Sequence, residues 1–364
     1  MKIIAFYLPQ FHCIPENDEW WGKGFTEWTN TKKGKPNFTG HYQPHTPLND
    51  NYYNLLDVNV QKKQIEMAKK YGVDGFCYYH YWFKNGKKLL EKPIENMLHN
   101  HDLDMPFCLC WANENWSRRW DGSENEVLME QDYDDIEGWK DHYRYLSNFF
   151  HDERYIKIDG NPILIIYKPD LIDDLKGRLE IMNEMARVDG FNKLIFISQY
   201  PQFDADIISA FDYTIEFEPQ YTTNKVRYYG FKSLFNNFLL FLNVGSAKIL
   251  QQLGLRSYKK FSYQIVAKDS WSRKLIDNHF PGAFPNWDNT ARKKERSDIY
   301  HGSTPDLFKT YIKKQLNKRY QDGSEPLFLF INAWNEWAEG AHLEPDEKYK
   351  HSYLEALRDA KNNL

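Results

Sequence analysis

The sequence contains few cysteines and no large excess of charge of either sign. Its four cysteines (Cys13, Cys77, Cys108 and Cys110) are too few to form a disulfide framework in a chain of 364 residues, so we expect free thiols. Its 47 Lys and Arg residues against 51 Asp and Glu leave a net charge of −4. The basic excess that would attract nucleic acid or an anionic membrane is missing, and we expect neither as a partner.

The sequence also lacks a long apolar run. A membrane-spanning helix needs roughly 18 uninterrupted apolar residues, and the closest candidate, 235–244, is broken by asparagines. The opening segment from Met1 to Gln10 is too short for a secretory signal peptide and is interrupted early by Pro9. We therefore expect no membrane span and, if Met1 is the native start, a protein that works in the cytoplasm.

The patterns that bind metals and phosphates are weak or missing. No set of His and Cys residues has the spacing of a zinc site, and His12, His41, His45 and His80 follow no regular interval. Residues 22–28 contain two glycines, but no Gly-Lys-Ser/Thr sequence follows them, so a phosphate-binding loop is not predicted. We expect neither a metal nor another cofactor.

Aromatic residues, in contrast, are abundant. The chain has 12 Trp, 25 Tyr and 24 Phe, which together make up 17% of its residues. Part of this set must build the core. Flat aromatic faces also bind the apolar faces of sugar rings, so the composition makes a carbohydrate a candidate ligand.

Short apolar runs recur along the chain, and most are followed by a stretch with helical spacing. Continuous apolar runs are typical of parallel strands that are covered on both faces. The runs are residues 3–8, 73–82, 107–112, 163–167, 194–199, 213–217, 282–287 and 327–333. The helical stretches between and after them include 58–71, 91–101, 173–188, 304–320 and 349–361. Eight such repeats predict an α/β fold, a (β/α)₈ TIM barrel, with an open doubly wound sheet as the alternative.

One long segment interrupts this alternation. Residues 220–281 follow the sixth run and include an apolar stretch at 231–253. We interpret the segment as a helical insertion packed on the barrel, because its Lys and Arg residues are too scattered for a membrane-surface helix. No internal repeat or low-complexity linker is evident, so residues 1–364 are predicted to form a single catalytic domain. The sequence does not indicate the oligomeric state.

In a barrel of this type the active site lies at the C-terminal ends of the strands. Aromatic, amide and carboxylate side chains follow nearly every run, which is hard to explain by packing alone. The candidates for substrate binding are Tyr7, Tyr79, Trp82, Trp111, Asn113, Glu114, Asn115, Trp116, Glu216, Trp287, Asp288, Asn335 and Trp337.

The strongest chemical signal follows the eighth run. Glu336 and Glu339 are three residues apart, so they lie on opposite faces of an extended strand but approach to about 5–6 Å in a turn. Gly340 favours the turn. A carboxyl pair about 5–5.5 Å apart suits retaining glycoside chemistry, whereas inverting enzymes need about 6.5–9.5 Å. The flanking Trp334 and Trp337 should partly desolvate the pair, which raises the pKa of one carboxyl toward the range of a general acid.

Two further motifs have both structural and functional interpretations. Alternation along residues 111–116, at the end of the third run, puts Asn113 and Asn115 on one face, where their amides would reach sugar hydroxyls. Glu114 then lies on the other face and pairs with a neighbouring arginine, unless the strand bends. A buried polar ladder explains the same pattern equally well. Asp288 either pairs with Arg292 as part of the framework or positions a sugar or phosphate.

At these motifs the sequence resembles a known family. The segments that carry the likeness are Phe6–His12, Glu19–Trp28, Gly40–Pro44, Trp111–Trp116, Trp287–Thr290 and Trp334–Gly340. They resemble the WbsX-like proteins, bacterial proteins usually encoded with genes for lipopolysaccharide or other surface glycans. The likeness runs from about residue 2 to residue 360. That group is similar in turn to glycoside hydrolase family 99, the endo-α-mannosidases, which are (β/α)₈ barrels.

The resemblance implies a role for each glutamate. Family 99 carries an Asn-Glu-Trp-x-Glu-Gly segment, and residues 335–340 match it. By this match, Glu336 is the base that deprotonates the 2-hydroxyl of the substrate, and this hydroxyl attacks the anomeric carbon to form an epoxide-like intermediate. Glu339 is the acid/base for the leaving group and for water. The resemblance implies retention of configuration without a metal.

The predicted function is a retaining, endo-acting glycosidase. Its substrate would be an α-linked, mannan-like surface polysaccharide or the precursor of one. A glycosyltransferase or transglycosylase is the first alternative, because a sugar hydroxyl can replace water in the second step. A non-catalytic glycan-binding assembly factor is the second alternative, and such a protein would need neither Glu336 nor Glu339.

Overall fold

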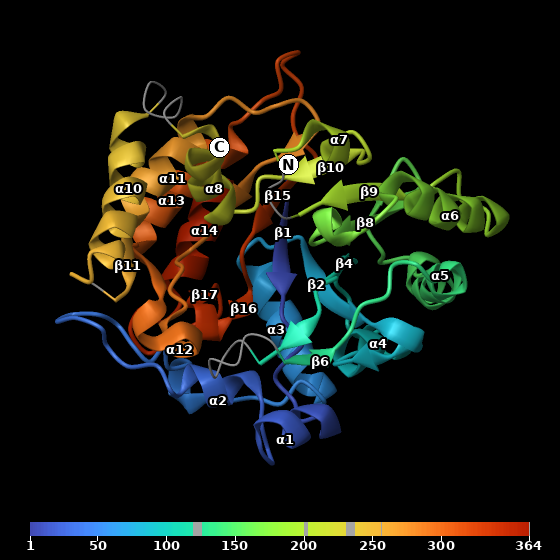
Figure 1. Ribbon diagram of the computed structural model, residues 1–364, viewed down its shortest axis with the longest axis horizontal. Helices are drawn as coiled ribbons and strands as arrows, with labels where there is room; N and C mark the ends of the chain where they lie inside the picture. The colour runs from blue at the N-terminus through green and yellow to red at the C-terminus, as the bar shows by residue number, and fades with distance from the viewer. Residues whose placement is uncertain (119–125, 200–202, 231–236, 256, 364) are drawn as a thin grey trace.

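The computed structural model describes residues 1–118, 126–199, 203–230, 237–255 and 257–363 (Figure 1). A sheet of parallel strands forms its centre, and helices surround it. The central strands are β1 (Lys2–Tyr7), β2 (Gly75–Trp82), β4 (Phe107–Trp111), β8 (Asn161–Ile166), β9 (Ile195–Ser198), β10 (Tyr213–Ile215), β12 (His279–Phe280), β13 (Gly282–Ala283) and β15 (Phe328–Ile331).

The sheet closes on itself through β12 and β13. β12 pairs in parallel with β10, and β13 pairs in parallel with β15. Only Pro281 separates the two short strands, so they are two halves of one strand that joins the first and last parts of the sheet. The strands therefore occupy eight positions of a closed barrel. This confirms the predicted (β/α)₈ fold and excludes the open sheet, although the seventh strand begins at His279 rather than at residue 282.

Both faces of the barrel strands are buried. Every residue of β4 and of β8 is buried, because one face fills the barrel interior and the other packs against helices. Cys77 of β2 lies opposite Cys108 of β4 in the register. The described structure contains free cysteines only, as predicted, with Cys13 exposed and the other three buried.

Helices that follow the strands cover the outside of the barrel (Figure 1). They are α3 (Val58–Lys70), α4 (Lys92–His99), α5 (Ile136–Phe150), α6 (Leu175–Val188), α13 (Pro305–Leu316) and α14 (Ser352–Asn362). The start of α13 shows why this helix could be predicted from the sequence. Thr304 caps the helix by accepting a hydrogen bond from the backbone N of Leu307, and Pro305 occupies the first turn, where no amide proton is needed.

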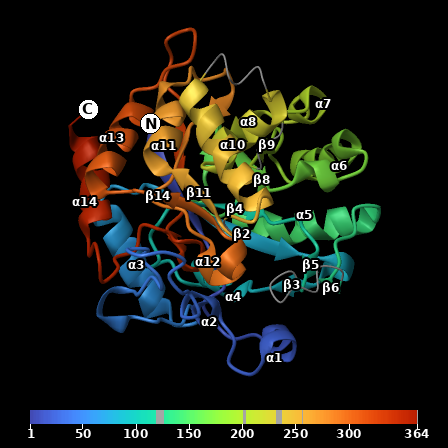
Figure 2. The same cartoon turned by 60° about the vertical axis from the view of Figure 1, so that its left-hand side comes forward.

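The segment after the sixth barrel strand is a helical insertion, as predicted. It contains α8 (Gln220–Tyr229), α10 (Phe238–Gln252), β11 (Lys259–Ser262) and α11 (Tyr263–Ser272). β11 pairs with β14 (Asp298–His301), which fastens the insertion to the chain beyond the seventh barrel strand. Figure 2 brings α10 to the front, outside α11.

Shorter elements complete the chain. At one end of the barrel lie α1 (Pro15–Trp21), α2 (Glu27–Thr31), α12 (Thr290–Lys293), β16 (Asn335–Glu336), η5 (Trp337–Glu339) and β17 (Ala341–His342). The others are η1 (Leu48–Asp50), η2 (Lys84–Gly86), β3 (Lys88–Leu89), β5 (Trp116–Ser117), β6 (Val127–Met129), β7 (Lys157–Ile158), η3 (Pro169–Leu171), α7 (Ala205–Ile208) and η4 (Lys294–Arg296). Among the described residues, no helix combines the length and the apolar character needed to cross a membrane.

Candidate active site

The two glutamates follow the last barrel strand in a turn, as the sequence predicted. Glu336 ends β16, and the helical turn η5 carries the chain to Glu339. Gly340 closes this turn with a φ of +61°, and a Cβ there would approach the backbone of Asp288 to 3.3 Å. Glycine is therefore required at this position both by conformation and by space.

A single guanidinium group holds the two glutamates together. Arg292 of α12 places Nη2 at 2.9 Å from an oxygen of Glu336 and Nη1 at 2.7 Å from an oxygen of Glu339. Its Nε lies 2.8 Å from a third carboxylate, that of Glu27 in α2. Glu336 and Glu339 thus bind the two terminal nitrogens of one planar group, which makes their carboxyl groups close neighbours.

Burial dominates the electrostatics of this cluster. It raises the pKa of Glu336 to about 8, because the loss of solvent outweighs the attraction of Arg292, and the nearby charge of Glu339 raises it further. Burial also raises the pKa of Glu27 against the same attraction. The pKa of Glu336 therefore lies close to neutral pH, which is typical of a carboxyl group that accepts a proton and returns it.

The two glutamates differ in access to solvent. The side chain of Glu339 is 19% exposed and that of Glu336 is 8% exposed. Glu339 is thus the carboxyl that a leaving group or a water molecule can reach from outside. Glu336 lies deeper, beside the barrel interior.

Two tyrosines of β2, each hydrogen-bonded to a glutamine, lie close enough to Glu336 for its charge to act on them. Gln199 donates to the hydroxyl of Tyr79 at 2.9 Å, and Gln10 donates to the hydroxyl of Tyr81 at 2.8 Å. Burial raises the pKa of both tyrosines, and the charge of Glu336 contributes to the increase in each case. Tyr79 is partly exposed, so it is the predicted substrate-binding residue whose position fits that role most directly.

Three predicted substrate-binding aromatics face the helices instead of the barrel interior. The hydroxyl of Tyr7 donates to Gln64 of α3 at 2.6 Å, and the ring of Trp82 stacks on His142 of α5. Trp111 donates to the backbone oxygen of Trp82 and packs against α5. The interpretation of these three residues as sugar platforms does not fit their orientation, because strand alternation directs them outward.

Trp337 is also not an exposed platform. It is 1% exposed, its ring stacks on His342 with 3.8 Å between centroids, and its Nε1 donates to Glu344 at 2.7 Å. Glu344 accepts further bonds from Tyr53 and Gln64, and burial raises its pKa to about 7. Trp337 therefore supports the turn that carries the glutamates, and it does so from within the core.

Two predicted asparagines are buried, and their side chains bond to neighbouring loops. Asn113 exchanges two hydrogen bonds of 2.7 Å with the backbone of Lys168, which joins the loops after β4 and β8. Asn335 makes the same type of exchange with Leu8. In both cases the amide fixes the rim of the barrel, and its bonding groups are directed at the protein rather than at a ligand.

Asp288 is likewise part of the framework. It does not pair with Arg292; its carboxylate lies 2.6 Å from Nε2 of His41 and accepts from Gln43 and Thr290. These contacts hold the pKa of Asp288 below its usual range, although burial alone would raise it. The contacts also tie α12, and with it Arg292, to the loop that contains His41.

Glu216 belongs to a buried ion cluster on the insertion side. Arg273, which follows α11, lies 2.7 Å from Glu216 and 2.9 Å from Glu218. Burial alone would raise the pKa of Glu216, but the charges of Arg273 and Lys318 lower it to about 2. This cluster fastens the insertion to the end of β10, which explains a carboxylate at this position without a substrate.

The remaining predicted residues lie at the rim or in the core. Glu114 pairs with Lys168 at 2.6 Å, whereas Arg118 pairs with Glu126 at 3.0 Å and Arg119 lies outside the described residues. Asn115 accepts from the backbone of Gln131 at 2.6 Å. Trp116 is half-buried, with its ring centroid 5.1 Å from that of Tyr81. Trp287 is buried.

Sequence reasoning missed Arg292, Glu27 and Tyr81 as members of the site. One of the two interpretations of Asp288 paired it with Arg292, because the two residues are close in the sequence. The pair of glutamates between tryptophans could have predicted a buried cation at the site, because neighbouring buried carboxylates require one.

Comparison with known proteins agrees with this architecture. A family model described as "Glycosyltransferase WbsX" matches residues 3–357. The chain belongs to this family. Two curated WxcX proteins of Xanthomonas campestris pv. campestris, from strains B100 and ATCC 33913 and both described as uncharacterized, are 36% identical to it over 98% of its length. The WbsX-family chain covers 49% of each relative, so it spans about half their length.

Solved structures share the barrel at low sequence identity. A family 99 endo-α-mannosidase from Bacteroides thetaiotaomicron superposes with a TM-score of 0.54 at 13% identity, over 99% of this chain and 96% of that chain. A glycoside hydrolase-like protein gives a TM-score of 0.58 at 13% identity, over 99% and 93%. At such identities the likeness shows the fold, which is the one that the WbsX-like segments implied.

Proposed function

We propose that this chain is a carbohydrate-active enzyme that cleaves α-linked glycosidic bonds with retention of configuration. The observation that carries the proposal is the pair of glutamates on Arg292, located after the last strand of a closed barrel. Membership of the WbsX family and the shared fold of an endo-α-mannosidase support a glycan as the substrate. We infer an α-linked, mannan-like surface polysaccharide or its precursor, cut within the chain, and residues 1–364 acting as one catalytic unit.

The positions of the two glutamates support different roles. Glu336 acts as the base on the 2-hydroxyl, because a carboxylate whose pKa is raised toward the working pH is a stronger base than an ordinary one. The activated oxygen attacks the anomeric carbon as the bond to the leaving group breaks. Glu339 protonates that leaving group and then deprotonates the incoming water, which fits its greater exposure.

Arg292 and the neighbouring polar residues position this chemistry. The guanidinium of Arg292 orients the carboxyl groups of Glu336 and Glu339, and Glu27 fixes the guanidinium by pairing with its Nε. Each carboxyl therefore has a fixed direction before the substrate binds. In this proposal Tyr79, which is partly exposed, and Gln10, which bonds to Tyr81, bind hydroxyls of the sugar. This model predicts no cofactor, because two positioned carboxyl groups are sufficient for the reaction.

Transfer to a sugar hydroxyl is the second candidate function. The family description names a glycosyltransferase, and the same intermediate can be opened by a sugar instead of water. Incubation of the chain with the surface glycan of its source organism, followed by mass spectrometry of the products, distinguishes the two. Released oligosaccharides mean hydrolysis and lengthened ones mean transfer, whereas unchanged glycan would contradict both. The matched control is a Glu336→Gln/Glu339→Gln double variant, which should leave the glycan intact.

A further inference from the structure

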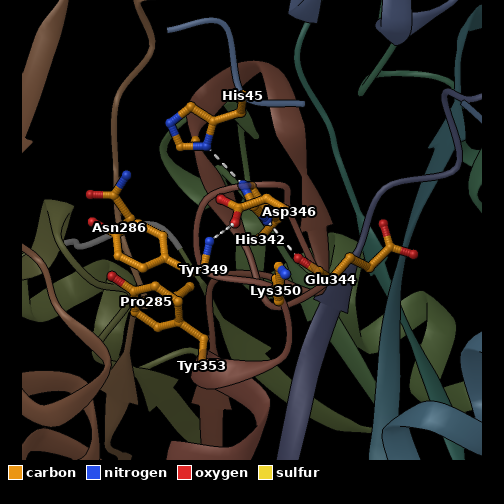
Figure 3. Close-up of a pocket in the computed structure, with 10 residues that line it drawn as sticks. His45, Pro285, Asn286, His342, Glu344, Asp346, Tyr349, Lys350 and Tyr353 are labelled. Carbon is orange, nitrogen blue, oxygen red and sulfur yellow. Dashed lines mark hydrogen bonds between the residues drawn. The ribbon is translucent and has the colours of Figure 1, made fainter. Parts of the chain in front are cut away.

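A small cavity lies beside the active-site turn, and three potential metal ligands meet at it (Figure 3). They are His45 from the loop after α2, His342 from β17, and Asp346 from the following turn. Within the part of the chain that the structure describes, they are the one set of three His, Cys, Asp or Glu residues whose ligand atoms all lie within 4.8 Å of one another. All three are buried.

The rings are already oriented toward one another. Nδ1 of His45 lies 2.8 Å from Nε2 of His342 (Figure 3), and Nδ1 of His342 lies 2.9 Å from the backbone oxygen of Glu344. A carbonyl can only accept, so the proton of a neutral His342 is on Nδ1 and the lone pair of Nε2 points at His45 and the cavity. A ring nitrogen bonded to a carbonyl behind a metal-binding nitrogen is the usual arrangement in metal sites.

Neighbouring groups hold the three residues in place. The ring of Trp337 stacks on His342, and that of Tyr42 stacks on His45 at 4.5 Å between centroids. The two loops are joined by backbone hydrogen bonds of 2.9 Å from Leu48 to Pro345 and from Glu347 to Thr46. The ligand set therefore does not depend on flexible surface side chains.

The size and charge of the cavity suit one small cation. Its volume is about 20 Å³, which exceeds the roughly 10–15 Å³ needed for one water molecule. Two imidazoles and one carboxylate are a ligand set for divalent first-row transition ions rather than for Mg²⁺ or Ca²⁺. Asp346 supplies the negative charge that balances the ion, against the positive charge of Lys350, which also lines the cavity. The Glu344 carboxylate is occupied by Trp337, Tyr53 and Gln64.

We propose that His45, His342 and Asp346 bind one divalent transition ion of the zinc class. The ion links the loop after α2 to the segment that follows the catalytic glutamates, and its fourth position opens to the cavity. Zinc–nitrogen bonds of about 2.0–2.1 Å in a tetrahedral site put two nitrogens about 3.3 Å apart, so the rings need to separate by about half an ångström on binding. Spacing along the chain did not predict this site, because the two histidines are 297 positions apart.

The test is metal binding by the full, untagged chain after removal of metals with a chelator. Calorimetric titration with ZnCl₂ should show one site per chain with a micromolar or lower Kd, and MgCl₂ should show none. CoCl₂ should produce the visible absorption bands of a tetrahedral Co²⁺ site. A native chain that binds no Zn²⁺ at millimolar concentration would overturn the proposal, and His45 and His342 would then be only a hydrogen-bonded pair.

Variants locate the site. His342→Gln should weaken Zn²⁺ binding at least about 100-fold and Asp346→Asn about 10–100-fold, and both should remove the Co²⁺ bands. His101→Gln, which changes an exposed histidine, is the matched control and should bind like the native chain. Equal affinity in all three variants would place the zinc elsewhere and refute the assignment. If His342→Gln does not fold, Asp346→Asn and the native Co²⁺ spectrum decide the question.

Discussion

Replacing Glu336 by glutamine should change how the stability of the protein depends on pH. Burial raises the pKa of this carboxyl from 4.5 to about 8 in the folded chain. A group with a raised folded pKa binds more protons when folded, so its contribution to stability is complete below pH 4.5 and is lost as the pH rises to about 8. At 1.36 kcal/mol per pKa unit the total is about 5 kcal/mol, of which about 3 kcal/mol falls between pH 5 and 7.5.

Urea unfolding of the native chain and of Glu336→Gln at several pH values measures this difference. The free energy of unfolding of the native chain should fall relative to that of the variant by about 3 kcal/mol between pH 5 and 7.5. Glu355→Gln, on the outer helix α14, is the control, and its free energy of unfolding should vary with pH as that of the native chain does. Parallel curves for native chain and Glu336→Gln would mean that Glu336 ionises in the ordinary range, and the reasoning from its burial would be refuted.

Three further substitutions test the surroundings of the pair. Arg292→Met should destabilise the fold by about 3–5 kcal/mol in urea unfolding, since it leaves Glu27 buried without its cation; an unchanged midpoint would contradict this. Trp337→Ala should cost about 3–5 kcal/mol of stability, and normal stability with lost glycan binding would restore the platform interpretation. Tyr79→Phe should lower stability by only about 1 kcal/mol and reduce kcat/KM for the glycan, whereas an unchanged kcat/KM would remove Tyr79 from the substrate site.

The barrel could be predicted because its strands leave a simple mark on the sequence. Parallel strands that are covered on both faces are apolar throughout, so each appears as an unbroken run. The turn at the two glutamates was also readable, because Gly340 supplies a backbone conformation that other residues adopt at a cost. The helical insertion at residues 220–281 was predicted because the Lys and Arg residues around its apolar stretch are too scattered for a membrane-surface helix.

The same property hides which side chains enter the site. When both faces of a strand are apolar, alternation does not reveal which face points into the barrel. Tyr7, Trp82 and Trp111 were therefore predicted to face the substrate, although they face the surrounding helices. Trp337 was misread for a related reason, since a tryptophan that supports a turn has the same sequence signal as one that binds a sugar. Contacts such as that of Arg292 with Glu27, 265 positions apart, arise only when the chain has folded.

The roles of Glu336 and Glu339 can be separated with two glycosides of the same sugar. The activated glycoside has a leaving group that needs no protonation, and the unactivated glycoside has one that does. Glu339→Gln should turn over the activated glycoside at near the native rate in the first step but lose about 10²–10⁴-fold on the unactivated one. Glu336→Gln should lose a similar factor on both, because no leaving group replaces the activation of the 2-hydroxyl. If both variants retain native turnover of the unactivated glycan, the two glutamates do not carry the reaction and the glycan-binding alternative replaces the enzyme.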